Sequence, residues 1–331
     1  AGLDVAPVAL PSNQRIFLGH EMVGSIVETG SEVKNFQVGD RVVRWGRAED
    51  CRARGHSEFC PACLQGHRVL CQFASELTEL RPIGGGFGDS FITPASTLVR
   101  VPGVLKNQQA ILTEPAAVAI HAVWRRIPKA GEKVLILGCG TIGFLLIQAI
   151  HALQTNCEIT AVAQFPWQAE LALGYGAGQV FLAGDDGYAQ VASLTGAKLY
   201  EGRSGNQMLL GGFDLVFDVV GVTSTLNDAL RWTRAGGTVV LVGVNLHRMR
   251  LDVTPIWYQE VDLVGAIGHD VVDWQGKSIS TFELAMDWMQ NGTLQVEQLL
   301  THTFPLYAYQ RAFSTAVDKR HARSIKVAFQ M

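Results

Sequence analysis

The apolar positions of the chain follow two different patterns. Up to about residue 105, short alternating runs lie between turns, and strands are predicted at Gly24–Glu28, Arg41–Val43 and Leu98–Val101. This pattern is typical of a β-rich, loop-rich domain. A helical pattern then extends from Ala116 to Arg126.

From Lys133 onward, short apolar runs alternate with helical segments. This rhythm predicts a parallel sheet with helices on both faces. The predicted strands are Val134–Leu137, Ile159–Ala163, Leu215–Val220 and Thr238–Val242, and the predicted helices are Ile142–Leu153, Gln168–Gly174 and Ser224–Trp232. After about residue 262 the sequence predicts one more amphipathic helix, Thr281–Met289, and a final strand, Ile325–Phe329.

The stretch from Val134 to Cys157 contains no Asp, Glu, Lys or Arg, and its length alone would indicate a transmembrane helix. Gly138, Gly140 and Gly143 interrupt it, and no secretory signal opens the chain. We therefore expect a buried strand followed by a buried helix, in a protein without a membrane partner.

Composition narrows the class of protein further. A length of 331 residues predicts about two domains. Hydrophobic residues make up 48% and charged residues 17%, which excludes a disordered chain. Lys and Arg number 27 against 30 Asp and Glu, so the basic surplus of a nucleic-acid binder is absent.

A glycine-rich motif lies between the first strand and the first helix of the alternating region. It is the GxGxxG sequence Gly138-Cys139-Gly140-Thr141-Ile142-Gly143, a pattern that brings backbone N–H groups to the pyrophosphate of a dinucleotide. The next strand ends at Ala163-Gln164, without the acid that usually binds the ribose of NAD. NADP would require a cation, and no Lys or Arg lies between Lys133 and Lys198. The sequence leaves NAD and NADP both open.

Four of the six cysteines are close together in the sequence: Cys51, Cys60, Cys63 and Cys71. Four thiolates over this length suit one tetrahedral structural Zn²⁺. The alternative is a set of unpaired thiols in a site that has lost its metal, and disulfides are less expected without a secretion signal. Cys139 and Cys157 are expected to be ordinary buried residues.

Two further groups have side chains suited to chemistry. His20-Glu21 combines a metal-binding side chain with an acidic neighbour, although such a pair is often structural. Glu114 precedes Pro115 at a helix start, where a carboxylate often just complements the helix dipole.

Together these features resemble the zinc-containing medium-chain alcohol dehydrogenases over nearly the whole chain. The matching segments are Gly19-His20-Glu21, Gly39-Asp40-Arg41-Val42, the cysteine group, Glu114-Pro115 with His121, the GxGxxG motif, Phe213–Gly221 and Gly236–Val240. The resemblance implies a GroES-like β domain over residues 1–124, a Rossmann domain over 125–260 that binds NAD(P), and a return to the first domain over 261–331.

The resemblance also implies roles for individual residues. His20 would bind a catalytic zinc, Glu21 would bind it or contact a ligand, and Glu114 would be the third ligand, as in the polyol branch. Further dinucleotide contacts would come from Ala163, Gln164, Val219 and Gly243, and substrate contacts from Trp45, Phe87 and His269. The implied reaction is hydride transfer between an alcohol or polyol-type substrate, or the corresponding carbonyl compound, and NAD(P).

The family also implies a cytoplasmic homo-oligomer, a dimer or tetramer. The apolar stretch Val261–Ile267 could be an edge strand that pairs between subunits or an ordinary internal strand.

Three departures from the family pattern bear on activity. The family's Cys-Gly-Ser/Thr-Asp motif has its nearest match at Ala1-Gly2-Leu3-Asp4, so either the ligand Cys and relay hydroxyl are missing or the chain is a fragment. Six extra residues separate Cys51 from Cys60, with Ser57 where the family has Cys, and the ribose acid is absent. Alternatives are a zinc-independent quinone or enone reductase on the same fold, and a non-catalytic NAD(P)-binding protein.

Overall fold

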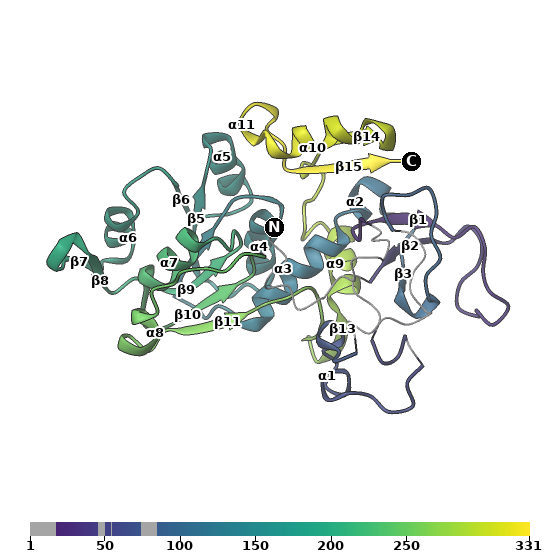
Figure 1. Ribbon diagram of the computed structural model, residues 1–331, viewed down its shortest axis with the longest axis horizontal. Coiled ribbons are helices and arrows are strands. Elements are labelled where there is room, and N and C mark those ends of the chain that lie inside the picture. The colour runs from purple at the N-terminus through teal and green to yellow at the C-terminus, as the bar shows by residue number, and fades with distance from the viewer. Residues whose placement is uncertain (1–17, 46–49, 54, 74–84) are drawn as a thin grey trace. The chain divides into compact units, whose positions relative to one another are not determined.

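A computed structural model describes residues 18–45, 50–53, 55–73 and 85–331 (Figure 1). Among these residues, one compact unit contains 122–267 and a second contains 18–121 together with 268–331. We call them unit 1 and unit 2. The domain bounds expected from the sequence, at 124/125 and 260/261, remain predictions.

Unit 1 is built on a six-stranded parallel sheet with the order β11-β10-β9-β4-β5-β6. Its helices include α4, which packs on β4, α5, which packs on β5 and β6, and α7, which packs on β9 and β10. The strands are β4 (Lys133–Leu137), β5 (Glu158–Ala163), β6 (Gln179–Leu182), β9 (Phe213–Asp218), β10 (Thr233–Leu241) and β11 (Asp262–Gly265), and the helices are α4 (Thr141–Ala152), α5 (Pro166–Gly174), α6 (Gly187–Thr195), α7 (Thr223–Trp232) and α8 (Thr254–Tyr258). The predicted alternating α/β fold is confirmed.

The uncharged stretch from Val134 to Cys157 contains β4, a central strand of this sheet, and α4, the helix that follows it. Four residues of β4, Val134 to Leu137, are buried, and β5 and β9 flank the strand. Eight successive residues of α4, from Gly143 to Ile150, are also buried. The stretch is therefore apolar because both elements are enclosed by protein. Among the described residues, the search for a helix long and apolar enough to cross a membrane finds none.

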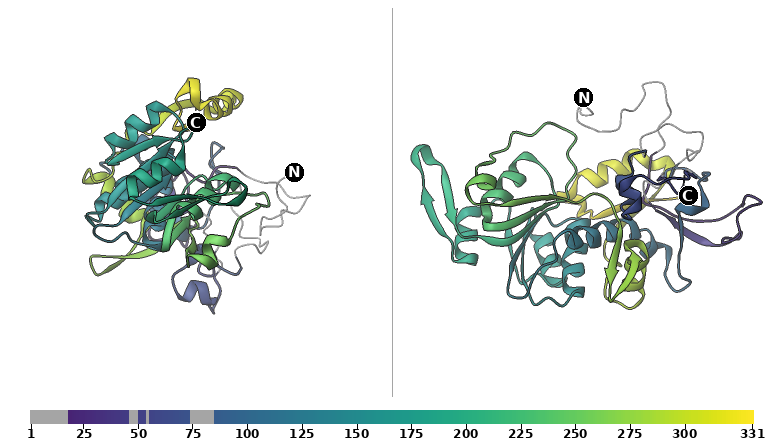
Figure 2. Two further views of the ribbon diagram at one scale, coloured as in Figure 1. Left: turned by 90° about the vertical axis from the view of Figure 1, so that its left-hand side faces the viewer. Right: turned by 90° about the horizontal axis from the view of Figure 1, so that it is seen from below.

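An antiparallel hairpin of β7 (Lys198–Glu201) and β8 (Gln207–Leu210) follows α6. Figures 1 and 2 show it beyond α6, away from the six-stranded sheet. Every residue of β7 is exposed, whereas Leu209 of β8 is buried. The apolar pattern of the sequence does not predict this hairpin.

Unit 2 contains three small sheets. β1 (Val23–Ser25), β2 (Arg41–Arg44) and β3 (Leu98–Arg100) are antiparallel, as are β12 (Val271–Trp274) and β13 (Lys277–Ser280). β14 (Leu300–Pro305) and β15 (Lys326–Gln330) run parallel. The helices are α1 (Pro61–Leu64), α2 (Asn107–Ala110), α3 (Thr113–Arg125), whose last residues belong to unit 1, α9 (Thr281–Gln290), α10 (Tyr309–Val317) and α11 (Lys319–Ala322).

Two predicted strands differ from the observed ones by more than one residue in length. β1 ends at Ser25, although Ile26 still exchanges backbone hydrogen bonds with Gly39 and Asp40. β10 begins at Thr233, earlier than predicted, because its pairing with β9 resumes after an irregularity between Thr233 and Thr238.

Candidate active site and metal centres

The glycine-rich loop connects β4 to α4 as the motif requires. A Cβ on Gly143 would lie 2.0 Å from the carbonyl oxygen of Gly138, so the first and last glycines of the motif pack directly together. A Cβ on Gly140, the N-cap of α4, would meet nothing within 4 Å, and no side chain caps this helix. Thr141 and Ile142 begin α4. The loop fits a pyrophosphate because its helix N-terminus is open to an anion.

The other predicted dinucleotide residues follow the carboxyl ends of neighbouring strands. Ala163 ends β5 and is buried, whereas Gln164, the next residue, is exposed. Val219 follows β9 and its N–H donates to Leu137. Gly243 follows β10 by two residues, and its N–H donates to the carbonyl of Asp218. The carboxyl edge of a parallel sheet is where such folds bind ligands.

Asp218 holds the loop after β9 in place. Its buried carboxylate accepts hydrogen bonds from the N–H groups of Val220 and Gly221 and from the hydroxyl of Thr225. Burial raises the pKa of Asp218, and the backbone hydrogen bonds oppose that rise. This accounts for an acid inside the apolar run Phe213–Gly221.

In unit 2, the structure brings His20, Glu21 and Glu114 together. One donor atom from each lies within 4.8 Å of the other two, and His20 Nε2 is 3.7 Å from Glu114 Oε1. Nitrogen and oxygen ligands at about 2.1 Å from a tetrahedral Zn²⁺ would be about 3.4 Å apart. The donor set therefore fits a zinc ion, and the His20–Glu114 distance is close to the one that such an ion requires.

Local geometry fixes both sides of this group. Gly19 has φ of +85°, and a Cβ there would lie 2.8 Å from the backbone nitrogen of Phe87. Only glycine allows this approach, and the N–H of Gly86 donates to Gly19 just before His20. Glu114 lies in the first turn of α3, where burial raises the pKa of its carboxyl group to about 7.

Lys326, at the start of β15, forms an ion pair with Glu21. Burial lowers the pKa of Lys326 to about 8. This partner could not be predicted from the sequence, because 304 residues separate Glu21 from Lys326 and nothing in a short final strand indicates which side chain its cation meets.

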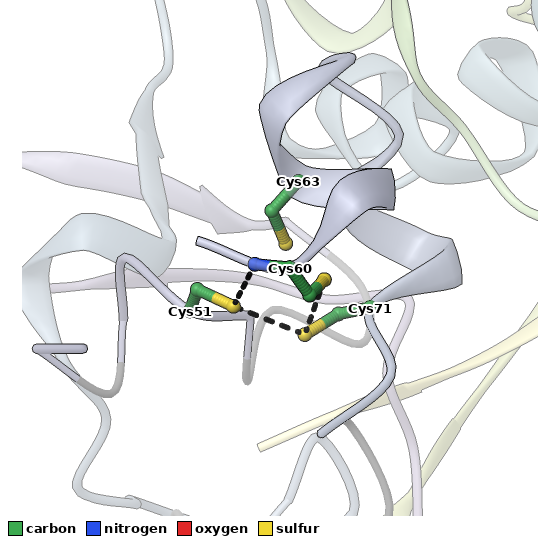
Figure 3. Close-up of side chains that lie close together, drawn as sticks. All are labelled: Cys51, Cys60, Cys63 and Cys71. Carbon is green, nitrogen blue, oxygen red and sulfur yellow. Dashed lines mark hydrogen bonds between the residues drawn. The ribbon is translucent and has the colours of Figure 1, made fainter. Parts of the chain in front are cut away.

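The four cysteines converge in unit 2 (Figure 3). Cys60 and Cys63 come from the start of α1, whereas Cys51 and Cys71 come from turns on either side of it. Cys71 Sγ is 3.7 Å from Cys51 Sγ and 3.9 Å from Cys60 Sγ. A Zn–S distance of about 2.3 Å in a tetrahedron requires sulfur atoms about 3.8 Å apart, so this spacing also fits zinc.

The surroundings of the cysteines favour a metal. Backbone hydrogen bonds from Gln72 and Cys63 lower the pKa of Cys60 to about 6, which favours its thiolate. Burial raises the pKa of Cys63 and of Cys71, so these sulfurs gain most from a cation that holds them ionised. The extra residues between Cys51 and Cys60 do not prevent the four thiols from converging.

The predicted substrate contacts do not all lie together. Trp45 and His269 are in edge-to-face contact, with ring centroids 4.7 Å apart, and Trp45 stacks on Phe282. Phe87 instead packs edge-to-face against Phe329, with centroids 4.9 Å apart. Burial, followed by the charges of His121, Arg68 and His20, lowers the pKa of His269 to about 3.

Arg68, which lies between Cys63 and Cys71 in the sequence, forms an ion pair with the buried Asp50. Its guanidinium also lies 5.0 Å from the centre of the Trp45 ring, so it connects the cysteine segment to Trp45.

The match at Ala1–Asp4 lies outside the described residues. Cys139 is buried as expected, but Cys157 is only half-buried.

Comparisons with known proteins show the family of this chain. Residues 4–103 match the alcohol dehydrogenase GroES-like domain, and residues 141–291 match the zinc-binding dehydrogenase family. D-arabinitol dehydrogenase 1 of Uromyces fabae is 28% identical, over 94% of this chain and 80% of its own. (R,R)-butanediol dehydrogenase of Bacillus subtilis (strain 168) is 31% identical, over 86% of this chain and 72% of its own. The crystal structure of 2R,3R-butanediol dehydrogenase from Bacillus subtilis gives a TM-score of 0.69 at 26% identity, over 94% of this chain and 80% of its own.

Both sequence families cover segments that hold a candidate site. The GroES-like match includes His20, Glu21 and the four cysteines, and the dehydrogenase match begins inside the glycine-rich motif. The chain belongs to the zinc-containing medium-chain alcohol dehydrogenase family, of the polyol type, and is a zinc-dependent oxidoreductase that transfers a hydride between an alcohol and NAD(P).

Proposed function

We propose that this dehydrogenase acts on polyols, with His20, Glu21 and Glu114 holding its catalytic zinc and the four cysteines holding a structural one. The observation that carries this proposal is the convergence of three donor side chains within 4.8 Å, one of them the largely buried Glu114. His20 and Glu21 are adjacent in the sequence, whereas Glu114 comes from the distant helix α3. A non-catalytic protein, or a reductase without zinc, would have no need of this arrangement.

The chain's own residues divide the work. When bound, zinc would polarise the substrate hydroxyl as a Lewis acid and NAD(P) would accept the hydride. His20 would supply an imidazole nitrogen as one donor, and Glu114 a carboxylate oxygen from a largely buried position. Lys326 balances the charge of Glu21 and fixes its direction. Three protein donors leave one position for substrate.

Two unsatisfied buried polar atoms in unit 2, on side chains that contact each other, support a polyol substrate. The side-chain nitrogens Trp45 Nε1 and His269 Nδ1 are buried, and neither has a hydrogen-bond partner among the described residues. His20 is close enough for its charge to lower the pKa of His269. A polyol has extra hydroxyl groups that would form hydrogen bonds with these two atoms, whereas a simple alcohol has none to spare. The relatives named for D-arabinitol and butanediol agree with this class.

Metal analysis of purified protein tests the proposal. We expect two Zn per chain, reduced to one by His20→Ala and to one by Cys63→Ser, with only the His20 variant losing polyol-dependent NAD(P)H formation outright. One Zn in the wild type, retained by His20→Ala, would leave the structural site alone and favour a non-catalytic protein. Zinc-free protein that still reduces quinones would favour the zinc-independent reductase.

We also propose that the protein is a homo-oligomer and works in the cytoplasm. The strand β11, which includes part of the stretch Val261–Ile267, lies at an edge of the described sheet rather than inside it. Trp257 and Tyr258 on α8, just before β11, are 69% and 60% exposed, and these adjacent aromatic side chains offer apolar surface to a partner subunit. Six free cysteines suit a reducing compartment.

A further inference from the structure

The loop after β5 is where Rossmann domains distinguish NAD from NADP. An acid at this strand end binds the 2′-hydroxyl of the ribose, whereas cations and free N–H groups receive the 2′-phosphate of NADP. Here the strand ends at Ala163 and is followed by Gln164, whose neutral side chain is exposed. The choice of cofactor must therefore be set by other groups around this loop.

The side chain of Gln168 already uses the backbone donors that follow this strand end. Gln168 is only 4% exposed, and its Oε1 accepts hydrogen bonds from the backbone N–H of Gln164 at 3.1 Å and of Phe165 at 3.2 Å. These N–H groups lie where the chain enters α5. Because the protein already satisfies both donors internally, a phosphate could use them only by displacing a buried amide.

The first turn of α5 has few other backbone N–H groups that a phosphate could use. Pro166 has no N–H, and the N–H of Gln168 donates to the carbonyl of Phe165 at 3.0 Å. Within residues 164–168, this leaves the Trp167 N–H as the main-chain donor that has no hydrogen-bond partner in the described part of the chain. The contrast is α4, whose N-terminus begins with glycine and has no side-chain cap. One helix start is open to a phosphate group and the other is closed.

Charge acts in the same direction. Leu182 is the register partner of Ala163 on the adjacent strand β6, and the carboxylate of Asp185 accepts a hydrogen bond from the Leu182 N–H at 2.9 Å. A carboxylate thus lies beside the end of β5. The nearest Lys or Arg residues along the chain are Lys133 and Lys198, and the segment between them contains neither residue type. A phosphate here would meet negative charge without a compensating cation from this segment.

We infer that the ribose subsite rejects a 2′-phosphate, so that the enzyme is selective for NAD, and that Gln168 is the residue that determines this selectivity. The inference rests on the proposed function, since it assumes that the glycine-rich loop binds a dinucleotide. Gln164 suits the free 2′-hydroxyl, because its amide both donates and accepts hydrogen bonds. The selectivity thus comes from a filled anion position and not from an acid at the strand end.

Equilibrium binding of NADH and NADPH to the zinc-loaded protein, followed by nicotinamide fluorescence, tests the inference without any turnover. We expect a Kd for NADPH at least about tenfold above that for NADH, the size of one lost charge-assisted hydrogen bond. Equal affinities, or tighter binding of NADPH, would overturn the inference and leave the proposed function standing. Binding of neither nucleotide would contradict the proposed function itself, and the inference with it.

The variant Gln168→Ala tests the two hydrogen bonds that the Gln168 side chain accepts. It frees the N–H groups of Gln164 and Phe165, so the ratio of the two Kd values should fall about tenfold, mainly through tighter NADPH binding. Gln148→Ala is the matched control, because Gln148 is also a buried helical glutamine, 5% exposed, on α4. Its ratio should equal that of the wild type. A ratio unchanged in Gln168→Ala would show that Gln168 does not set selectivity.

A second variant covers the case in which Gln168→Ala fails to fold. Gln168→Glu keeps an acceptor oxygen for the same two N–H groups but adds a negative charge, so NADPH binding should weaken further while NADH binding changes less than about threefold. If the charged variant leaves the Kd ratio unchanged, Gln168 is too far from the 2′ position and the inference fails.

Discussion

Lys326 shows how one side chain can complete a site that its own sequence segment does not suggest. It pairs with Glu21, next to His20, although all of unit 1 lies between them in the sequence. Both side chains are partly buried, at 17% and 27% exposure, so either charge left alone would be costly. The pair therefore keeps Glu21 in a fixed direction whether or not a metal is present.

Asp228 on α7 has the opposite situation, since none of the described cations forms an ion pair with it. Burial, and then the charge of Asp218, raises the pKa of Asp228 to about 6, against about 3.9 for an ordinary Asp. Above pH 6 the carboxylate is ionised in both the folded and the unfolded chain, and the folded chain bears the cost of a half-buried charge. Below about pH 4 the group is neutral in both and that cost disappears.

We therefore expect Asp228→Asn to stabilise the protein. After allowance for solvent screening, the gain in free energy of unfolding should be about 1 kcal/mol above pH 6 and should shrink as the pH falls from 6 toward 4. Urea denaturation across this range measures it. Glu170→Gln, which alters an exposed carboxylate on α5, should show no such trend. A loss of stability in Asp228→Asn at pH 8 would contradict the prediction.

At the residue scale, the sequence identified groups of residues but not their partners. The spacing of the four cysteines and of the glycines carried a specific chemical pattern, and both sets lie close together in the structure. Lys326 and Gln168 were missed because their importance depends on which atoms they meet. An isolated Lys or Gln in an apolar context has no pattern that indicates its partner.

At the scale of elements, α9 is the helix whose start is best defined by its sequence. Ser280 Oγ accepts from the N–H of Glu283 at 3.2 Å, and Glu283 Oε2 accepts from the Ser280 N–H at 3.3 Å and from its hydroxyl at 2.6 Å. This capping box satisfies donors that the helix would otherwise leave unpaired. Phe282, Leu284, Ala285 and Met286 are buried directly after it.

Removing the cap should weaken the whole of unit 2. We expect Ser280→Ala to lower the free energy of unfolding by about 1 kcal/mol, the usual cost of an N-cap serine. Thermal or urea denaturation gives the value. Ser278→Ala, two residues earlier at an exposed position of β13, is the control and should change it by less than about 0.3 kcal/mol. Equal effects of the two substitutions would mean that the cap contributes nothing.

Elements were predictable where one face or both faces are buried. The central strands β4, β5, β9 and β10 and the helices α4 and α7 follow their apolar patterns. The hairpin β12–β13 was missed because its two-residue turn uses Gln275 and Gly276, both at positive φ, and glutamine is a rare choice there. The hairpin β7–β8 was missed because its exposed residues give no alternation.

At the scale of the whole molecule, the order of the strands in the six-stranded sheet could not be predicted from the apolar pattern. The rhythm predicted a parallel sheet, but β4 lies between β5 and β9, with β11 and β6 at the two edges. Local patterns describe each strand's own faces and say nothing of its neighbours. The open edge of β11 is the feature of this arrangement that bears on assembly.

Main-chain pairing at β11 should be sensitive to proline. The N–H of Ala266 donates to Leu241 of β10, so by alternation the N–H of Leu263 is directed outward, to any partner strand. We expect wild-type protein to elute as a dimer or tetramer in size-exclusion chromatography, and Leu263→Pro to shift it toward the monomer. Leu263→Ala keeps the N–H and should stay assembled. A monomeric wild type would refute pairing at this edge.

The interruption of unit 2 by unit 1 has a consequence for biosynthesis. The segment that carries His20, Glu21 and Glu114 is translated before unit 1, and the segment that carries Lys326 is translated after it. The described part of unit 1 is one continuous segment and can fold as soon as it has left the ribosome, whereas unit 2 must wait for its second half. Until then Glu21 lacks its cation, so the site reaches its final charge balance late in synthesis, after the nucleotide-binding unit already exists.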